Sequence, residues 1–186
     1  MTTTHTLTPE HCPLCEALWA RMNKPRETRE QIYPEGGWIP LVRSSIQDVF
    51  EIMLGCKVEI SATTPPENLQ AITAVIGLAG YVTGTLNLRC SAATARAIAG
   101  IMLGFAVEDG PAGEEIVYDA LGEICNMVAG SFKGRIPGVE EACSLSTPTI
   151  VTGSDYQVHT IANGERVMAA FSFNGSPVWV SLELHQ

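Results

Sequence analysis

One order of secondary structure is predicted twice along this 186-residue chain: a long amphipathic helix comes first, and several strands follow. In the first half, apolar residues recur at helical spacing from Ile39, and Gly55 supplies a stop. Segments rich in β-branched residues come next, and Ser91 can then cap a shorter helix. The strands are predicted at 57–62, 72–79 and 82–89, and the shorter helix at 92–103.

The second half repeats this order. A helix is predicted from about Glu114 to Lys133, and strand patterns follow at 144–152, 157–161, 167–173 and 178–184. Asn174 and Gly175 lie between two alternating runs and are a strong signal for a two-residue hairpin. The repeated order predicts an α+β fold in which long helices pack on a mostly antiparallel sheet built from two similar halves.

Residues 1–37 differ in character from the rest of the chain. They are rich in Thr, Pro, Glu and Arg, and they end in Pro34-Glu35-Gly36-Gly37, a run that breaks regular structure. Too few apolar residues are available there for an independent core. We therefore expect an N-terminal extension over 1–37 and a single domain over 38–186.

The charge balance and the cysteines limit the functional class. With 11 basic and 20 acidic residues, the net charge of −9 argues against nucleic acid or an anionic membrane surface as a partner. The chain begins without a basic segment followed by an apolar run, so we expect a cytoplasmic protein whose six cysteines are mostly free and buried. The uncharged stretch 68–88 is long enough for a membrane span, but its glycines and β-branched residues favour buried strands.

The helix predicted over 114–133 separates its apolar and polar side chains. Its buried stripe consists of Val117, Leu121, Ile124 and Val128. The opposite side carries five residues at successive steps of four, three, four and three, so they line up along one ridge. We call this set the ridge: Asp119, Glu123, Asn126, Gly130 and Lys133.

The pair Glu123 and Asn126 gives the ridge its possible chemistry. A carboxylate and a carboxamide three residues apart can reach one external target together, the first accepting from a cation and the second both donating and accepting. Asparagine can hold a water molecule but is no strong base. A mechanism that uses Asn126 must therefore position a nucleophile against a centre that is already electrophilic, such as an aspartyl phosphate.

An isolated Glu-x-x-Asn most often marks only the solvated face of a helix. The longer string Asp119-x-x-x-Glu123-x-x-Asn126-x-x-x-Gly130, followed by Ser131-Phe132-Lys133, resembles the signature of the CheC/CheX/FliY phosphatases. Three further segments look like CheX segments in the same order, and with the motif they span about 39–186. These segments are 49–55, 76–80 and 144–153.

The resemblance implies a CheC/CheX-like fold of two pseudo-repeats and a phosphatase that hydrolyses the aspartyl phosphate of a phosphorylated CheY-like receiver. It implies that Asn126 orients the attacking water and that Glu123 pairs with the receiver's active-site lysine. Asp119, Gly130 and Lys133 would contact the receiver. Mg²⁺ would belong to the receiver, and this chain would need no metal or cofactor.

The first predicted helix departs from the family pattern. Gln47 and Phe50 stand where a second site would need Glu and Asn. One site in the second half is the CheX arrangement, so the resemblance implies a homodimer. The alternative function is a non-catalytic module that binds a receiver, similar to the flagellar switch proteins.

Two other groups of residues invite a chemical interpretation. His11, Cys12 and Cys15 could supply three zinc ligands and His5 a fourth, but no second Cys/His pair has matching spacing. An incidental tail with free thiols is the favoured interpretation. Cys125 is adjacent to Asn126, but its helical angle points away from the ridge, so we expect it to pack in the core.

Overall fold

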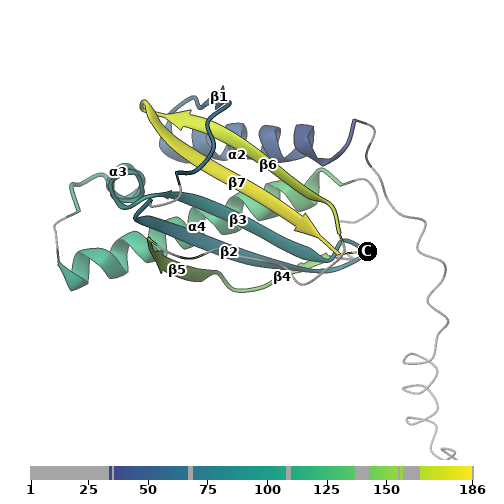
Figure 1. Ribbon diagram of the computed structural model, residues 1–186. Helices are drawn as coiled ribbons and strands as arrows, with labels where there is room; N and C mark the ends of the chain where they lie inside the picture. The colour runs from purple at the N-terminus through teal and green to yellow at the C-terminus, as the bar shows by residue number, and fades with distance from the viewer. Residues whose placement is uncertain are drawn as a thin grey trace, which may run out of the picture. The chain divides into compact units, whose positions relative to one another are not determined.

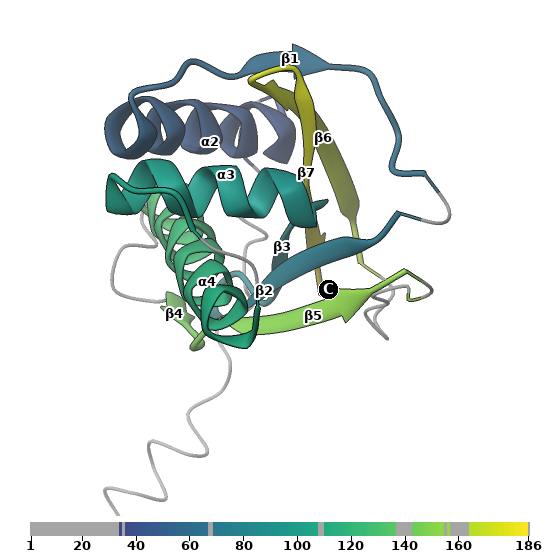
Figure 2. The same cartoon turned by 90° about the vertical axis from the view of Figure 1, so that its left-hand side faces the viewer.

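Three helices cover one face of an antiparallel sheet in the described part of the computed structural model, as the two views in Figure 1 and Figure 2 show. The structure describes residues 34, 36–66, 69–107, 110–136, 143–154, 156 and 164–185, which fall in one unit, Tyr33–Gln186. The helices are α2 (Trp38–Leu54), α3 (Ala92–Leu103) and α4 (Pro111–Gly134).

The sheet is interlocked between the two halves of the chain. Its order is β1-β6-β7-β3-β2-β4, β5 also pairs with β2, and every pairing is antiparallel. Each half contributes one central hairpin, and short strands from the other half flank it: β1 pairs with β6, and both β4 and β5 pair with β2. The strands are β1 (Glu59–Ser61), β2 (Ala71–Gly80), β3 (Gly84–Ser91), β4 (Cys143–Leu145), β5 (Thr149–Gly153), β6 (Arg166–Phe173) and β7 (Ser176–Leu184). The predicted α+β fold with two similar halves is confirmed.

The core lies between the helices and the sheet, and most side chains of the central strands β3 and β7 are buried. Aromatic contacts tie the helices into this core. Phe50 of α2 packs edge-on against Phe173 of β6, with ring centroids 5.6 Å apart, and Trp38 lies 6.0 Å from Phe132 of α4. The predicted stripe of α4 is buried in full. In α2, Val42, Ile46, Val49 and Phe50 are buried, whereas Met53, predicted to continue their stripe, is 39% exposed.

Local signals placed several boundaries correctly. α3 spans the predicted residues, and Ser91 Oγ accepts a hydrogen bond of 3.1 Å from the backbone N of Thr94. Gly55 and Gly104 end their helices in the left-handed conformation. Asn174 and Gly175 both have positive φ, 48° and 78°, which the tight turn between β6 and β7 requires.

Other boundaries differ from the predictions. α4 begins at Pro111, one turn earlier than predicted, because proline at the first helical position loses no hydrogen bond there. The single strand predicted at 144–152 is two strands, β4 and β5, since residues 146–148 leave the ladder. The strand predicted at 57–62 is limited to the three residues of β1.

Some predictions fall on residues outside the described set. These are the extension up to residue 33, with its candidate zinc ligands, and the strand predicted at 157–161. The stretch 68–88 that could have spanned a membrane forms β2 and β3 over its described residues. Across the described ranges, no helix combines the length and the apolar character that a membrane crossing needs.

Gly84 lies where two backbones come closest. A Cβ atom built on it would be 2.0 Å from the carbonyl O of Glu183 on β7, far inside van der Waals contact. Because the obstacle is backbone within a paired strand, no side-chain rotation can relieve it. The central β3–β7 pairing therefore requires glycine at this position.

We predict that Gly84→Ala lowers the free energy of unfolding by about 1–3 kcal/mol or more, because the methyl group forces β3 and β7 apart. Urea unfolding followed by circular dichroism measures the change. Gly134→Ala at the end of α4 is the control, since its Cβ would have no atom of the described ranges within 4 Å. Equal midpoints for the two variants would contradict the close approach.

Candidate functional site

The ridge of α4 points to solvent along its length. Asp119, Glu123 and Gly130 are exposed, and Asn126 and Lys133 are half-buried. The structure thus brings all five predicted residues onto one accessible side of one helix. Among the described residues, neither Glu123 nor Asn126 makes a hydrogen bond or an ion pair, so both side chains are available to an external partner.

The orientation of the ridge is fixed from the opposite side of the helix. The thiol of Cys125 is fully buried and lies 3.5 Å from the carbonyl O of Ala74 on β2 and 4.0 Å from that of Leu86 on β3. Asn126 directly follows Cys125. The contacts of Cys125 with the two strands therefore fix the rotation of α4 that turns the Asn126 amide outward. The prediction that Cys125 packs in the core is confirmed.

Burial also makes this thiol chemically inert. It raises the pKa of Cys125 to about 12, and it raises the pKa of Cys90 on β3 to about 12 as well. A thiol that keeps its proton up to such a pH is a poor nucleophile near neutrality. The cysteine beside the motif is therefore structural.

A second contact positions the turn of α4 that precedes Glu123. Gly122 lies against the segment that separates β4 from β5, and a Cβ built on it would be 3.2 Å from Cβ of Pro148. That segment is held by Ser146, whose Oγ accepts a hydrogen bond of 2.8 Å from Gly77 N and whose own N donates 2.9 Å to Gly77 O. The segment that interrupts the predicted strand, between β4 and β5, therefore packs against α4 and supports it.

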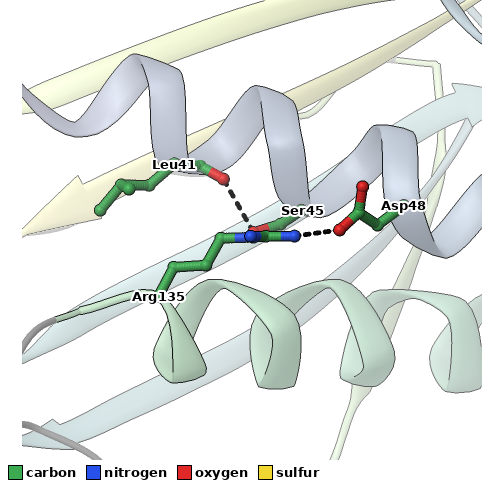
Figure 3. A network of polar contacts seen from close by, with 4 residues as sticks. All are labelled: Leu41, Ser45, Asp48 and Arg135. Atoms are coloured by element: carbon green, nitrogen blue, oxygen red, sulfur yellow. Dashed lines mark hydrogen bonds and ion pairs between the residues drawn. The ribbon is translucent and has the colours of Figure 1, made fainter.

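The end of α4 is tied to α2, as Figure 3 shows. The guanidinium of Arg135 donates to Asp48 of α2, and Ser45 donates 2.8 Å to the carbonyl O of Leu41 one turn earlier in the same helix. Arg135 is the residue directly after α4. The long helix is therefore held at its C-terminal end as well as at its centre, which fixes the direction of the ridge.

The corresponding positions of α2 make no second site. Phe50 is fully buried against Phe173, whereas Gln47 is exposed. The two side chains do not share an accessible surface, so α2 offers no counterpart of the Glu123 and Asn126 pair. Nor do the described residues bring three His, Cys, Asp or Glu side chains together in a group that could hold a metal ion.

Sequence reasoning missed a cavity of about 270 Å³ near the start of α4. Its polar lining includes Arg96 of α3, Glu114 and Tyr118 of α4, and Thr152 of β5. Tyr118 donates a hydrogen bond of 3.4 Å to Glu114, and burial together with this carboxylate raises the pKa of the phenol. The whole lining comes from four separate elements, β2, α3, α4 and β5, so no motif in the sequence could have indicated it.

The comparisons with known proteins bear on the family and the fold. The family model described as "Chemotaxis phosphatase CheX" matches residues 72–172, more than half of the chain. The CheY-P phosphatase CheX of Thermotoga maritima is 28% identical over 88 residues, which are 47% of this chain and 56% of that protein. The chain thus matches a little over half the length of this relative.

Solved structures share the fold at low identity. The chemotaxis protein CheX from Vibrio vulnificus has a TM-score of 0.66 and 21% identity, covering 80% of this chain and 96% of that one. CheX from Borrelia burgdorferi, solved as a CheX-CheY-BeF3-Mg complex, has a TM-score of 0.68 and 18% identity, covering 80% and 98%.

We predict that the buried thiol of Cys125 makes the fold less stable at high pH. Below about pH 7.5, one unit under the ordinary thiol pKa, the thiol is neutral in both states, so its ionisation does not affect stability. As the pH rises from about 9 toward 12, the unfolded chain loses this proton and the folded chain keeps it. The free energy of unfolding then falls by about 1.4 kcal/mol per pH unit for each such thiol.

Urea unfolding of the wild type and of Cys125→Ala between pH 8 and pH 10 tests this prediction. Other groups that titrate in this range are the same in both proteins, so they cancel in the difference. The variant should lose stability less steeply above pH 9, whatever its stability at pH 8. Parallel curves for the two proteins would show that the thiol is ionised as easily in the fold as in the unfolded chain.

Proposed function

Since the chain belongs to the chemotaxis phosphatase CheX family, we propose that it hydrolyses the aspartyl phosphate of a CheY-like response regulator. The observation that carries this proposal is the exposed pair Glu123 and Asn126, two side chains without partners among the described residues, on a helix held rigidly from behind. A relative that carries the name CheY-P phosphatase supports the same reaction.

In the proposed mechanism, α4 is laid against the active site of the receiver, and Asn126 enters it. The amide oxygen of Asn126 accepts a hydrogen bond from a water molecule, and its NH₂ group can donate to the phosphoryl oxygens. The water oxygen then attacks phosphorus while the bond from phosphorus to the aspartyl oxygen breaks. The aspartate leaves as a carboxylate, and the phosphoryl group leaves as inorganic phosphate.

This mechanism needs positioning from the chain but no basic side chain, because both protons of the attacking water remain on the inorganic phosphate that forms. An acyl phosphate has a good leaving group, so a correctly placed water needs no strong base, and orientation supplies the rate. The role of Asn126 is that of the glutamine that orients water in a GTPase. Mg²⁺, which stabilises phosphoryl charge, belongs to the receiver in this proposal.

Glu123 is the anchor of the complex in this proposal. Its carboxylate would accept a hydrogen bond from the receiver's active-site lysine one helical turn away from Asn126, a charge-assisted contact worth about 1.5–3 kcal/mol. The net charge of −9 gives no general attraction to an acidic receiver site. Specific contacts along the ridge, including Asp119, Gly130 and Lys133, would then have to supply the docking.

We predict that Asn126→Ala slows receiver dephosphorylation by about a hundredfold or more, since one oriented hydrogen-bonding group is removed from the transition state. Glu123→Ala should weaken receiver binding and turnover by about tenfold or more, because its contact to the lysine is lost. The measurement is the decay of a phosphorylated receiver from the same genome in Mg²⁺, at several concentrations of this chain.

Glu59→Ala is the matched control, because Glu59 is an exposed acid on β1, outside α4 and its ridge. It should leave the decay rate unchanged. A receiver that binds while its phosphate decays at the spontaneous rate would contradict the proposal and favour the binding module. Unchanged decay with Asn126→Ala would remove Asn126 from the mechanism.

We predict that Gly130→Ala impairs turnover without loss of stability. A Cβ at this position meets no atom of the described residues within 4 Å, and alanine is the better helix former by about 1 kcal/mol. The methyl group would instead obstruct the receiver on the ridge. Gly134→Ala, one turn further along and equally open, is the control and should keep normal turnover. A Gly130→Ala protein that melts earlier yet turns over normally would contradict the prediction.

A further inference from the structure

The face of the sheet opposite the helices carries a small polar cavity, which we call the cup. This face is turned to the viewer in Figure 1. The cup has a volume of about 70 Å³, and its lining includes Thr73 of β2, Asn87 and Arg89 of β3, and Trp179 and Ser181 of β7. The antiparallel register aligns these residues, since Arg89 pairs with both Thr73 and Trp179, and Asn87 pairs with Ser181.

Asn87 brings an unsatisfied polar atom to the cup. Its side chain is only 4% exposed, and its Nδ2 donates 3.1 Å to Ser181 Oγ. The Oδ1 atom is buried and has no hydrogen-bond partner among the described residues, a condition that is unfavourable in a folded protein. A turn of the amide by 180° would let Oδ1 accept from the Ser181 hydroxyl and place the NH₂ donor in the cup.

Arg89 brings an unpaired cation. Its guanidinium carbon lies 5.0 Å from the ring centroid of Tyr156. Within the described part of the chain, no carboxylate pairs with it and its buried Nε has no acceptor. Arg166, which also lines the cup, differs because its Nε lies 3.2 Å from Glu183. Arg89 is therefore a half-buried cation that no carboxylate among the described residues neutralises, although the chain carries a net charge of −9.

The groups around Arg89 are held in place. The hydroxyls of Tyr156 and Thr73 are hydrogen-bonded at 2.6 Å, and Tyr156 also donates 3.3 Å to the carbonyl O of Val151. The indole N–H of Trp179 is already used, since it donates 2.9 Å to the carbonyl O of Thr63. Trp179 therefore offers the cup only apolar surface, and the free donors are those of Arg89 and Asn87.

We propose that the cup binds the carboxylate group of a small organic acid. A guanidinium presents parallel N–H donors that match the two oxygens of a carboxylate, and the Asn87 amide can donate a further hydrogen bond. The volume admits a carboxylate with one or two carbon atoms, which would lie against Trp179. The cup is on the opposite face of the sheet from the ridge, so this site is independent of the proposed phosphatase reaction.

The test is a nuclear magnetic resonance titration of the full chain with sodium acetate, with sodium chloride exchanged to keep the ionic strength constant. We expect the signals of the Asn87 side-chain amide and of Arg89 Nε–H to shift and to saturate together as one site. Shifts that stay linear in acetate, or that chloride reproduces, would overturn the proposal.

Arg89→Gln should weaken acetate binding by about tenfold or more, because the charge-assisted hydrogen bonds are lost. Lys57→Gln removes the same charge from an exposed position and should leave the affinity unchanged. Equal weakening in both variants would show attraction by net charge alone and would overturn the site.

A second pair of variants leaves the buried residues intact. Met168 lines the cup and is 42% exposed, so Met168→Glu places a carboxylate beside Arg89 that competes with acetate. Met168→Gln has nearly the same shape without the charge. We expect acetate affinity to fall about tenfold in the first variant and to persist in the second. Equal affinities would overturn the proposal.

The source of the carboxylate is tested by recording the nuclear magnetic resonance spectrum of the protein without acetate at two protein concentrations. A free acid predicts that the Asn87 and Arg89 signals do not depend on protein concentration before acetate is added. A concentration dependence that acetate abolishes would overturn the small acid as the ligand and would assign the carboxylate to a second copy of the chain.

Discussion

The burial of α4 on the β2–β3 hairpin is the interaction on which the rest of the structure depends. The side chains of a helix leave its axis at fixed angles, so the sinking of Leu121, Ile124, Cys125 and Val128 into the core turns Glu123 and Asn126 to solvent. The exposure of the ridge therefore needs no interaction beyond the burial of the opposite side of α4. The contact of Gly122 with Pro148 and the pair of Arg135 with Asp48 then hold the helix at two further points.

Much of the fold could be predicted because its signals are local. The stripe of α4, the cap at Ser91 and the turn at Asn174-Gly175 each depend on residues within a few positions of one another. The exposure of Glu123 and Asn126 follows from the same helical period. Their placement is therefore as predictable as the helix itself, whereas their chemistry is suggested only by the longer motif and the family.

The features that sequence reasoning missed all depend on contacts between distant residues. β4 ends at Leu145, and Ser146 is hydrogen-bonded to Gly77, which is 69 residues away in the sequence. No local sequence pattern distinguishes this break from a continuous strand. The cup assembles from four strands whose register only the folded sheet defines. Arg135 and Asp48 likewise look like ordinary surface charges until α2 and α4 lie side by side.

The exchange of short strands between the two halves has a consequence for how the chain can open. The hairpin of each half is edged by a strand of the other, β1 on β6 and β4 with β5 on β2. If one half came apart, it would withdraw its strand and leave the neighbouring hairpin with a bare hydrogen-bonding edge. Partial opening is therefore penalised on both sides at once, and the two halves behave as one cooperative unit that cannot be divided at its midpoint.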